Sequence, residues 1–124
     1  MTNILLVMAG GSIGALSRYG VSLLAVKLCG SRFPWGTLAV NLAGCFLIGV
    51  AYALADRGST WMTPSVRVFF VTGYLGALTT FSTYALETTR AGAEDHVSAL
   101  LNMAANNLLG LALVLLGAWV ARAR

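Results

Sequence analysis

Side-chain hydroxyl groups cluster in the middle of a long apolar segment. Residues 73–87 read GYLGALTTFSTYALE, and six consecutive positions bring five hydroxyls: Thr79, Thr80, Ser82, Thr83 and Tyr84. Two preceding glycines, Gly73 and Gly76, loosen the backbone. Irregular polar backbone at membrane depth occurs only where it is buried in protein or lines a cavity. The segment therefore predicts an ion pathway or an ion site.

A broken helix at this point offers ligand groups of two kinds. Freed carbonyl oxygens suit a small cation such as Na⁺, whereas exposed N–H groups and hydroxyls suit an anion. Phe81 and Tyr84 are three residues apart and share a helix face. Their ring edges carry positive partial charge, which can face an anion. The alternative is two rings that only pack between helices, and the surrounding hydroxyls favour the pathway.

Two other apolar segments carry polar stripes. Asn41 follows Thr37 by four residues, and Asn102, Asn106 and Gly110 also repeat at spacing four. Four residues are close to one helical turn, so each set lies along one face. A single asparagine can either bond another helix or line a pathway. Together with the broken segment, the two stripes favour a polar pathway.

Three further polar residues have open interpretations. Asn107 lies off the stripe, where it is expected to bond another helix. Glu87 is the only acid embedded in an apolar run, which makes it a functional candidate, although it can also reach headgroup water or pair with Arg90. Arg18 can extend to the membrane interface or attract an anion.

Composition indicates an all-α membrane protein with one domain over residues 1–124. The chain is 58% hydrophobic and 10% charged, with mean hydropathy +0.81, whereas soluble domains carry about 25% charged residues. The net charge of +4 gives no reason to expect nucleic acid. No nucleophile–base pair or metal cluster suggests an enzyme, and the first segment is interpreted as a retained helix rather than a signal peptide.

Four segments are long enough to cross a bilayer. They cover about residues 3–26, 36–55, 66–89 and 97–121, and the third is expected to break near its middle. Short polar connections are expected at residues 27–34, 56–65 and 90–96. The chain is thus predicted to be a multi-pass protein of the cell (plasma or inner) membrane, in contact with lipid.

The positive charges are almost balanced between the two ends of these segments. One end holds Arg57, Arg67, Arg122 and Arg124, and the other holds Lys27, Arg32 and Arg90, with Arg18 nearby. The positive-inside rule needs an excess on one side. The balance favours dual topology and an antiparallel assembly of identical subunits, while a single orientation set by one strong charge is the alternative.

Three strings carry a resemblance to a known family. GGSIGALSRY, WGTLAVNLAGCFLIG and GALTTFSTYALE resemble the Fluc (CrcB-type) fluoride channels, and the resemblance covers essentially the whole chain. It implies an antiparallel, dual-topology homodimer of four-span subunits with two pores for passive fluoride export. It also implies a structural Na⁺ at the dimer centre, held by the backbone carbonyls of Gly76 and Thr79.

The same resemblance implies a fluoride pathway. Its expected residues are Asn41, Thr80, Phe81, Ser82, Thr83, Tyr84 and Asn106. Glu87 matches the family's acid and, with Arg18, is expected to be a vestibule or gating charge. The chain departs from the common pattern at Tyr84, where Phe is frequent, and at Ala77, where Gly is frequent; Asn106 and Gly110 stand where some members have serine.

Two other function classes remain open. A small dual-topology drug exporter would need a membrane carboxylate for proton exchange, and Glu87 is the only candidate. A purely structural membrane subunit would conduct nothing by itself.

Overall fold

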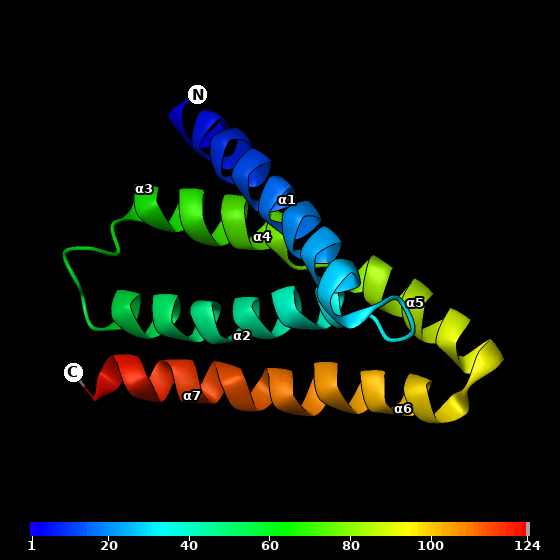
Figure 1. Cartoon of the computed structure of the whole chain (residues 1–124). Coiled ribbons are helices and arrows are strands. Elements are labelled where there is room, and N and C mark those ends of the chain that lie inside the picture. The colour runs from blue at the N-terminus through cyan, green and yellow to red at the C-terminus, as the bar shows by residue number, and fades with distance from the viewer. Residues whose placement is uncertain (124) are drawn as a thin grey trace.

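The computed structural model describes residues 1–123, and these residues form an all-helical fold (Figure 1). Arg124, which entered the charge count, lies outside the described residues. The elements are α1 (Thr2–Cys29), α2 (Trp35–Asp56), α3 (Pro64–Arg67), the π-helical η1 (Val68–Leu75), α4 (Gly76–Leu78), α5 (Phe81–Glu94), α6 (His96–Ala104), the π-helical η2 (Ala105–Leu109) and α7 (Gly110–Arg122).

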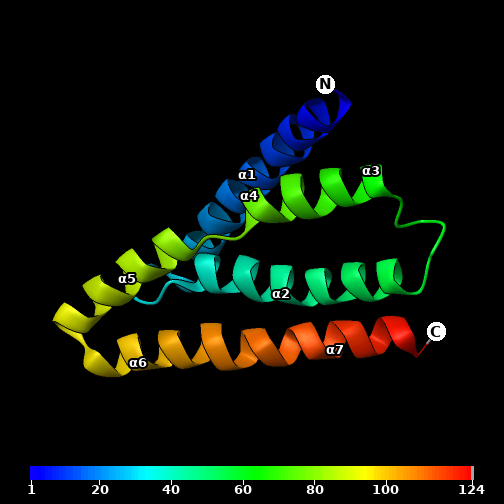
Figure 2. The same cartoon turned by 180° about the vertical axis from the view of Figure 1, so that it is seen from behind.

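These elements build four helical segments, as predicted. α1, α2 and the continuous stretch from α6 to α7 are each long and apolar enough to cross a membrane. The segment from α3 to α4 and the helix α5 are two parts of the interrupted third one. Figures 1 and 2 show α2 and α7 side by side and running in the same direction. The segment from α3 to α4 runs back above α2, and α1 crosses that segment.

The interruption lies at Thr79 and Thr80, which adopt extended backbone (φ −83°, ψ 154° and φ −151°, ψ 121°). The expected glycines precede it and remain helical, since Gly73 is in η1 and Gly76 begins α4. Gly73 serves close packing instead, because a Cβ there would lie 3.1 Å from Gly10 Cα. Two consecutive threonines, not the glycines, carry the change of direction.

The predicted polar connection at residues 90–96 is wrong, because α5 continues to Glu94 and α6 begins at His96. The chain turns at Asp95 alone. Its carboxylate caps α6 by accepting hydrogen bonds from Val97 N (3.0 Å) and Ser98 N (3.3 Å). A further bond from the Ser98 hydroxyl is the main cause that lowers the pKa of Asp95.

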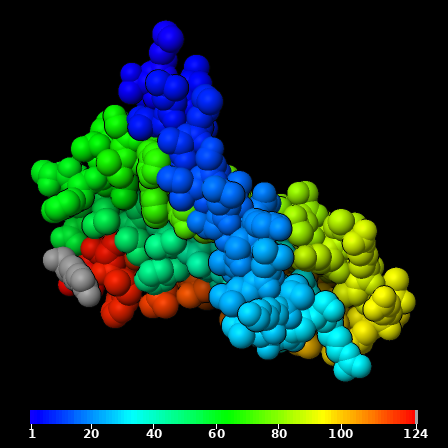
Figure 3. Space-filling model, turned by 45° about the horizontal axis from the view of Figure 1, so that its top comes forward, coloured from blue at the N-terminus to red at the C-terminus, as the bar shows by residue number. Residues whose placement is uncertain are grey.

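Two glycines four residues apart, Gly10 and Gly14, let α1 approach the third segment closely. These two are the buried residues of α1. A Cβ on Gly10 would overlap the carbonyl oxygen of Phe69, and a Cβ on Gly14 would overlap that of Tyr74. Beyond this contact, Figure 3 shows the first turns of α1 projecting clear of the other helices.

A reciprocal glycine pair joins α2 to α7. A Cβ on Gly49 would overlap the carbonyl oxygen of Val114, and a Cβ on Gly117 would overlap that of Phe46. Each helix therefore presents a glycine to the backbone of the other, which is the geometry of small-residue packing in membranes.

Substitution of Gly14 by alanine tests this packing. We expect Gly14→Ala to lower the free energy of unfolding by about 1–3 kcal/mol, since the added methyl group must displace backbone. Gly20→Ala is the matched control on the same helix, because a Cβ there meets nothing within 4 Å. Unfolding of the detergent-solubilised protein measures both, and equal stabilities would contradict the packing role.

Candidate functional site

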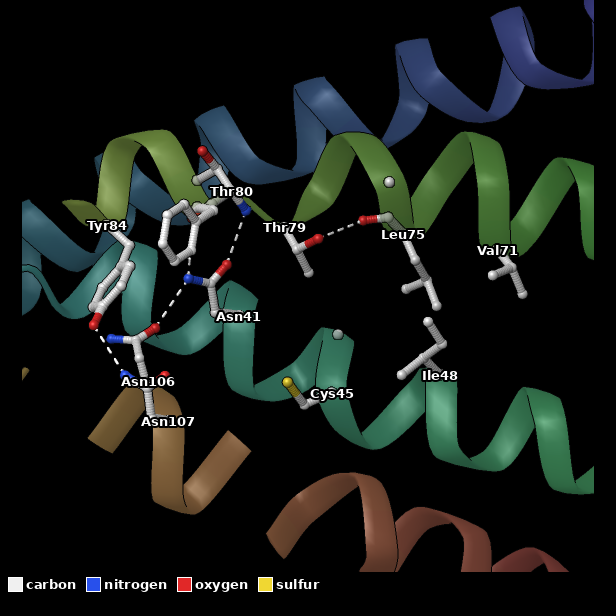
Figure 4. Close-up of a pocket in the computed structure, with 13 residues that line it drawn as sticks. Asn41, Cys45, Ile48, Val71, Leu75, Thr79, Thr80, Tyr84, Asn106 and Asn107 are labelled. Atoms are coloured by element: carbon white, nitrogen blue, oxygen red, sulfur yellow. Dashed lines mark hydrogen bonds between the residues drawn. The ribbon is translucent and has the colours of Figure 1, made fainter. Parts of the chain in front are cut away.

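A pocket of about 350 Å³ lies beside the extended residues, between α2, the third segment and η2 (Figure 4). We call it the central pocket. Seven predicted site residues line it: Asn41, Gly76, Thr79, Thr80, Phe81, Tyr84 and Asn106. Its other lining residues are Gly44, Cys45, Ile48, Val71, Leu75 and Asn107. Among these described residues none carries a charged side chain.

The side chain of Asn41 pairs with the extended backbone of Thr80. Thr80 N–H donates to Asn41 Oδ1 (2.9 Å), and Asn41 Nδ2 donates to Thr80 O (3.2 Å). One carboxamide thus satisfies both backbone groups of a residue that has left the helix. Such groups are costly to leave unpaired away from water.

Two carbonyl groups lose their helical donors at the break, one to the Asn41 side chain and one to the Thr80 side chain. The helical donor for Gly76 O would be Thr80 N–H, which bonds Asn41 instead. The donor for Thr79 O would be Thr83 N–H, which bonds Thr80 Oγ1 (3.2 Å). Both carbonyl oxygens therefore lack their helical hydrogen bond. They are the two carbonyls that the family resemblance implies as ligands of a structural Na⁺.

A chain of amide hydrogen bonds extends from Asn41 across the helices. Asn41 Nδ2 donates to Asn106 Oδ1 (3.0 Å), and Asn106 Nδ2 donates to Asn102 Oδ1 (2.9 Å). Asn102, which is fully buried, donates to Thr88 Oγ1 (2.8 Å). Every amide accepts through oxygen and donates through nitrogen, so the chain has one direction. It links α2, the fourth segment and α5.

The hydroxyls of the TTFST string form a cluster at the start of α5. Thr80 Oγ1 donates to Thr83 Oγ1 (3.1 Å) and lies 3.3 Å from Ser82 Oγ. Ser82 and Thr83 do not line the central pocket, unlike Thr80. They are therefore linked to the central pocket through the Thr80 hydroxyl.

The aromatic pair lies at one edge of the central pocket. Ring centroids of Phe81 and Tyr84 are 5.4 Å apart, with an interplanar angle of 57°. Phe81 is 76% exposed, whereas Tyr84 is 8% exposed. Asn107, expected to bond another helix, donates to the Tyr84 hydroxyl oxygen (3.0 Å). The two rings thus differ in environment, one presented outward and one held between helices.

Glu87 and Arg18 lie outside the central pocket. Glu87 lines a second pocket of about 370 Å³ near the end of the third segment, together with Arg32, Arg90 and Glu94. The Glu87 Oε2 atom is buried without a hydrogen-bond partner among the described residues. Arg18 is half-buried on α1, one turn before Ser22 of that pocket. The structure therefore places these two charged residues outside the central pocket.

Three α2 residues that complete the pocket, Gly44, Cys45 and Ile48, were not among the predicted site residues. Gly44 faces the methyl group of Thr79, which a Cβ there would overlap. Cys45 and Ile48 line the pocket floor on the same helix. Their spacing of three, four and seven from Asn41 was the available signal, since these positions share its face.

Comparison with known proteins decides the family. The protein-family model described as "CrcB-like protein, Camphor Resistance (CrcB)" matches residues 5–118 of this chain. The chain belongs to the CrcB-like family. It is a multi-pass membrane protein of that family, with three described helices that can each span a bilayer unbroken.

Curated relatives of this CrcB-like chain match it over nearly its full length. A protein of Salinibacter ruber is 50% identical over 119 residues, which cover 95% of this chain and 88% of the relative. A protein of Shewanella putrefaciens is 47% identical, covering 94% of both chains. One of Dehalococcoides mccartyi is 43% identical, covering 97% of this chain and 92% of the relative. Each carries the name fluoride-specific ion channel FluC.

Loss of the Asn102 side chain tests the amide chain. We expect Asn102→Ala to lower the free energy of unfolding by about 1–3 kcal/mol, since buried polar groups of Asn106 and Thr88 lose a partner. Met103→Ala is the control at the adjacent, 45% exposed position, with an effect within about 0.5 kcal/mol. The measurement is unfolding in detergent, and a silent Asn102→Ala would contradict a structural role.

Proposed function

We propose that this chain is a fluoride-specific ion channel that lets fluoride leave the cytoplasm passively. The near full-length similarity to proteins of that name supports the ion's identity. The observation that carries the proposal is the central pocket, where an exposed aromatic ring, hydroxyls and amides surround a helix break without any charged side chain among the described residues. This arrangement fits an ion channel better than an enzyme.

The start of α5 supplies electrostatic attraction for an anion. The first N–H groups of a helix have no helical partner, and the helix dipole makes that end positive. Phe81 is the first residue of α5 and lines the central pocket. Its ring edge adds positive partial charge where water is scarce. Weak contacts of this kind replace hydration without trapping the ion.

Neutral surroundings also favour a channel over a proton-coupled exporter. Glu87, the acid that such an exporter would need, lines the second pocket rather than the central one. A passive channel requires no proton exchange, because a negative cell interior favours anion exit by about 2.3 kcal/mol per 100 mV.

The released carbonyls fit a structural sodium ion. Gly76 and Thr79 both line the central pocket, and the helical donors for their carbonyl oxygens are engaged elsewhere. Hard carbonyl oxygens at the carboxyl end of a broken helix are suited to Na⁺. In an antiparallel pair of subunits, the same carbonyls of the second copy would complete the ligand set. The ion would stabilise the dimer and carry no current.

Exposure of the pocket wall supports an antiparallel homodimer. Phe81 is 76% exposed in the single chain, although it flanks the polar pathway. A second copy would cover this ring and close the open side of the pocket, giving two pores per dimer. The nearly balanced positive charges of the two ends permit both orientations. Lipid covers the remaining apolar faces.

Ion efflux from liposomes tests the channel. We expect liposomes with the purified protein to lose fluoride rapidly and to retain chloride, as read by two ion-selective electrodes. Phe81→Ile should slow fluoride efflux by about tenfold or more, which corresponds to a lost ring contact of about 1.4 kcal/mol. The control Trp119→Ile changes a 66% exposed ring on α7, outside the central pocket. Chloride loss equal to fluoride loss would refute fluoride specificity.

The chain's own thiols test dual topology. Cys29 is exposed at the end of α1, whereas Cys45 is half-buried within α2. A charged, membrane-impermeant maleimide added to intact cells should label about half of the Cys29 thiols, and permeabilisation should expose the rest. Cys29→Ser should abolish labelling in both conditions. Labelling of nearly all or nearly none before permeabilisation would establish a single orientation.

A further inference from the structure

The amide donors of the central pocket are already used within the protein. Asn41 Nδ2 donates to Thr80 O and to Asn106 Oδ1. Asn106 Nδ2 donates to the backbone and side-chain oxygens of Asn102. A carboxamide nitrogen has two hydrogens. Neither amide therefore has a hydrogen left for an ion.

The threonine hydroxyls of the central pocket are used as well. Thr79 Oγ1 donates to Leu75 O (2.9 Å), and Thr80 Oγ1 donates to Thr83 Oγ1 (3.1 Å). A hydroxyl has one hydrogen to donate. An anion that enters the pocket must therefore find its side-chain O–H or N–H donor elsewhere.

The Tyr84 hydroxyl keeps a hydrogen that no described residue accepts. Asn107 Nδ2 donates one hydrogen to Met103 O (2.8 Å) and the other to Tyr84 Oη (3.0 Å). The phenol oxygen is thus an acceptor in this bond, and its own hydrogen has no acceptor among residues 1–123. Tyr84 is buried and lines the central pocket. A buried donor without a partner is costly unless a ligand meets it.

We propose that the Tyr84 hydroxyl donates a hydrogen bond to the permeating anion, and that Asn107 positions it by occupying the phenol oxygen. This inference rests on the proposed channel function and names a specificity residue within it. A small, hard anion gains a short charge-assisted bond from a phenol. A larger halide accepts a weaker bond and needs more room beside the Phe81 ring, 5.4 Å away by centroids.

Removal of the hydroxyl tests the donor. Tyr84→Phe should raise the fluoride concentration that half-saturates efflux by about tenfold, equivalent to about 1.4 kcal/mol. Tyr74→Phe is the matched control, because that ring stacks on Phe70 and lies outside the central pocket. Half-saturation of Tyr84→Phe within twofold of wild type would mean that only water meets the hydroxyl, and would overturn the proposal.

A double-mutant cycle tests the role of Asn107. Asn107→Ala should raise the half-saturating concentration in the wild-type background and leave it unchanged in the Tyr84→Phe background, since Asn107 acts through the hydroxyl. Equal effects in both backgrounds would assign Asn107 a separate structural role and overturn its positioning role.

A third substitution keeps the test decisive if Tyr84→Phe fails to fold. Incorporation of 3-fluorotyrosine at position 84 retains the hydroxyl and makes it a stronger donor. It should lower the half-saturating fluoride concentration, and an unchanged value would overturn the proposal. Wild-type protein that moves no fluoride in the same liposomes would instead refute the channel function itself.

Discussion

The pairing of one carboxamide with one extended residue is the constraint on which the rest of the structure depends. A helix can be interrupted at membrane depth only if the released backbone groups find partners. Asn41 supplies both partners for Thr80, and the Thr80 side chain then caps α5. By taking these N–H groups, the two side chains release carbonyls on one side of the break and start a new helix on the other. Opposite helix ends consequently meet at one point, which a continuous helix cannot provide.

Close packing makes this pairing possible, because the side chain of asparagine is short. Gly44 lies against the methyl group of Thr79, so α2 approaches the interrupted segment with little intervening bulk. The contacts of Gly49 and Gly117 bring the backbones of α2 and α7 together as well. Asn106 can then reach Asn41 from the fourth segment. Small residues keep the helices close together, so the short amide side chains can form hydrogen bonds from one helix to the next.

Sequence patterns predicted most of the fold and seven of the residues that line the central pocket, for physical reasons. A run of about 20 apolar residues marks each membrane-spanning segment. Polar groups are rare inside such runs, so they mark candidate lining residues. The position of the break was harder to predict, because Gly73 could either loosen the helix or allow close helix packing. In the structure Gly73 packs against Gly10. The turn at Asp95 was missed since a single capping carboxylate can replace a whole loop. The partner of Tyr84 depended on helix rotation, which spacing within one helix does not determine.

The one-way order of the amide chain has a consequence for membrane energetics. A proton wire conducts by the Grotthuss mechanism, in which each group accepts a proton on one side and releases another. Carboxamides hold their hydrogens near neutral pH, and Asn41, Asn106 and Asn102 are each fixed by bonds at both ends. Polar groups thus continue through the protein without forming a path for proton hopping. A membrane can therefore contain this chain of amides without losing its proton gradient through it.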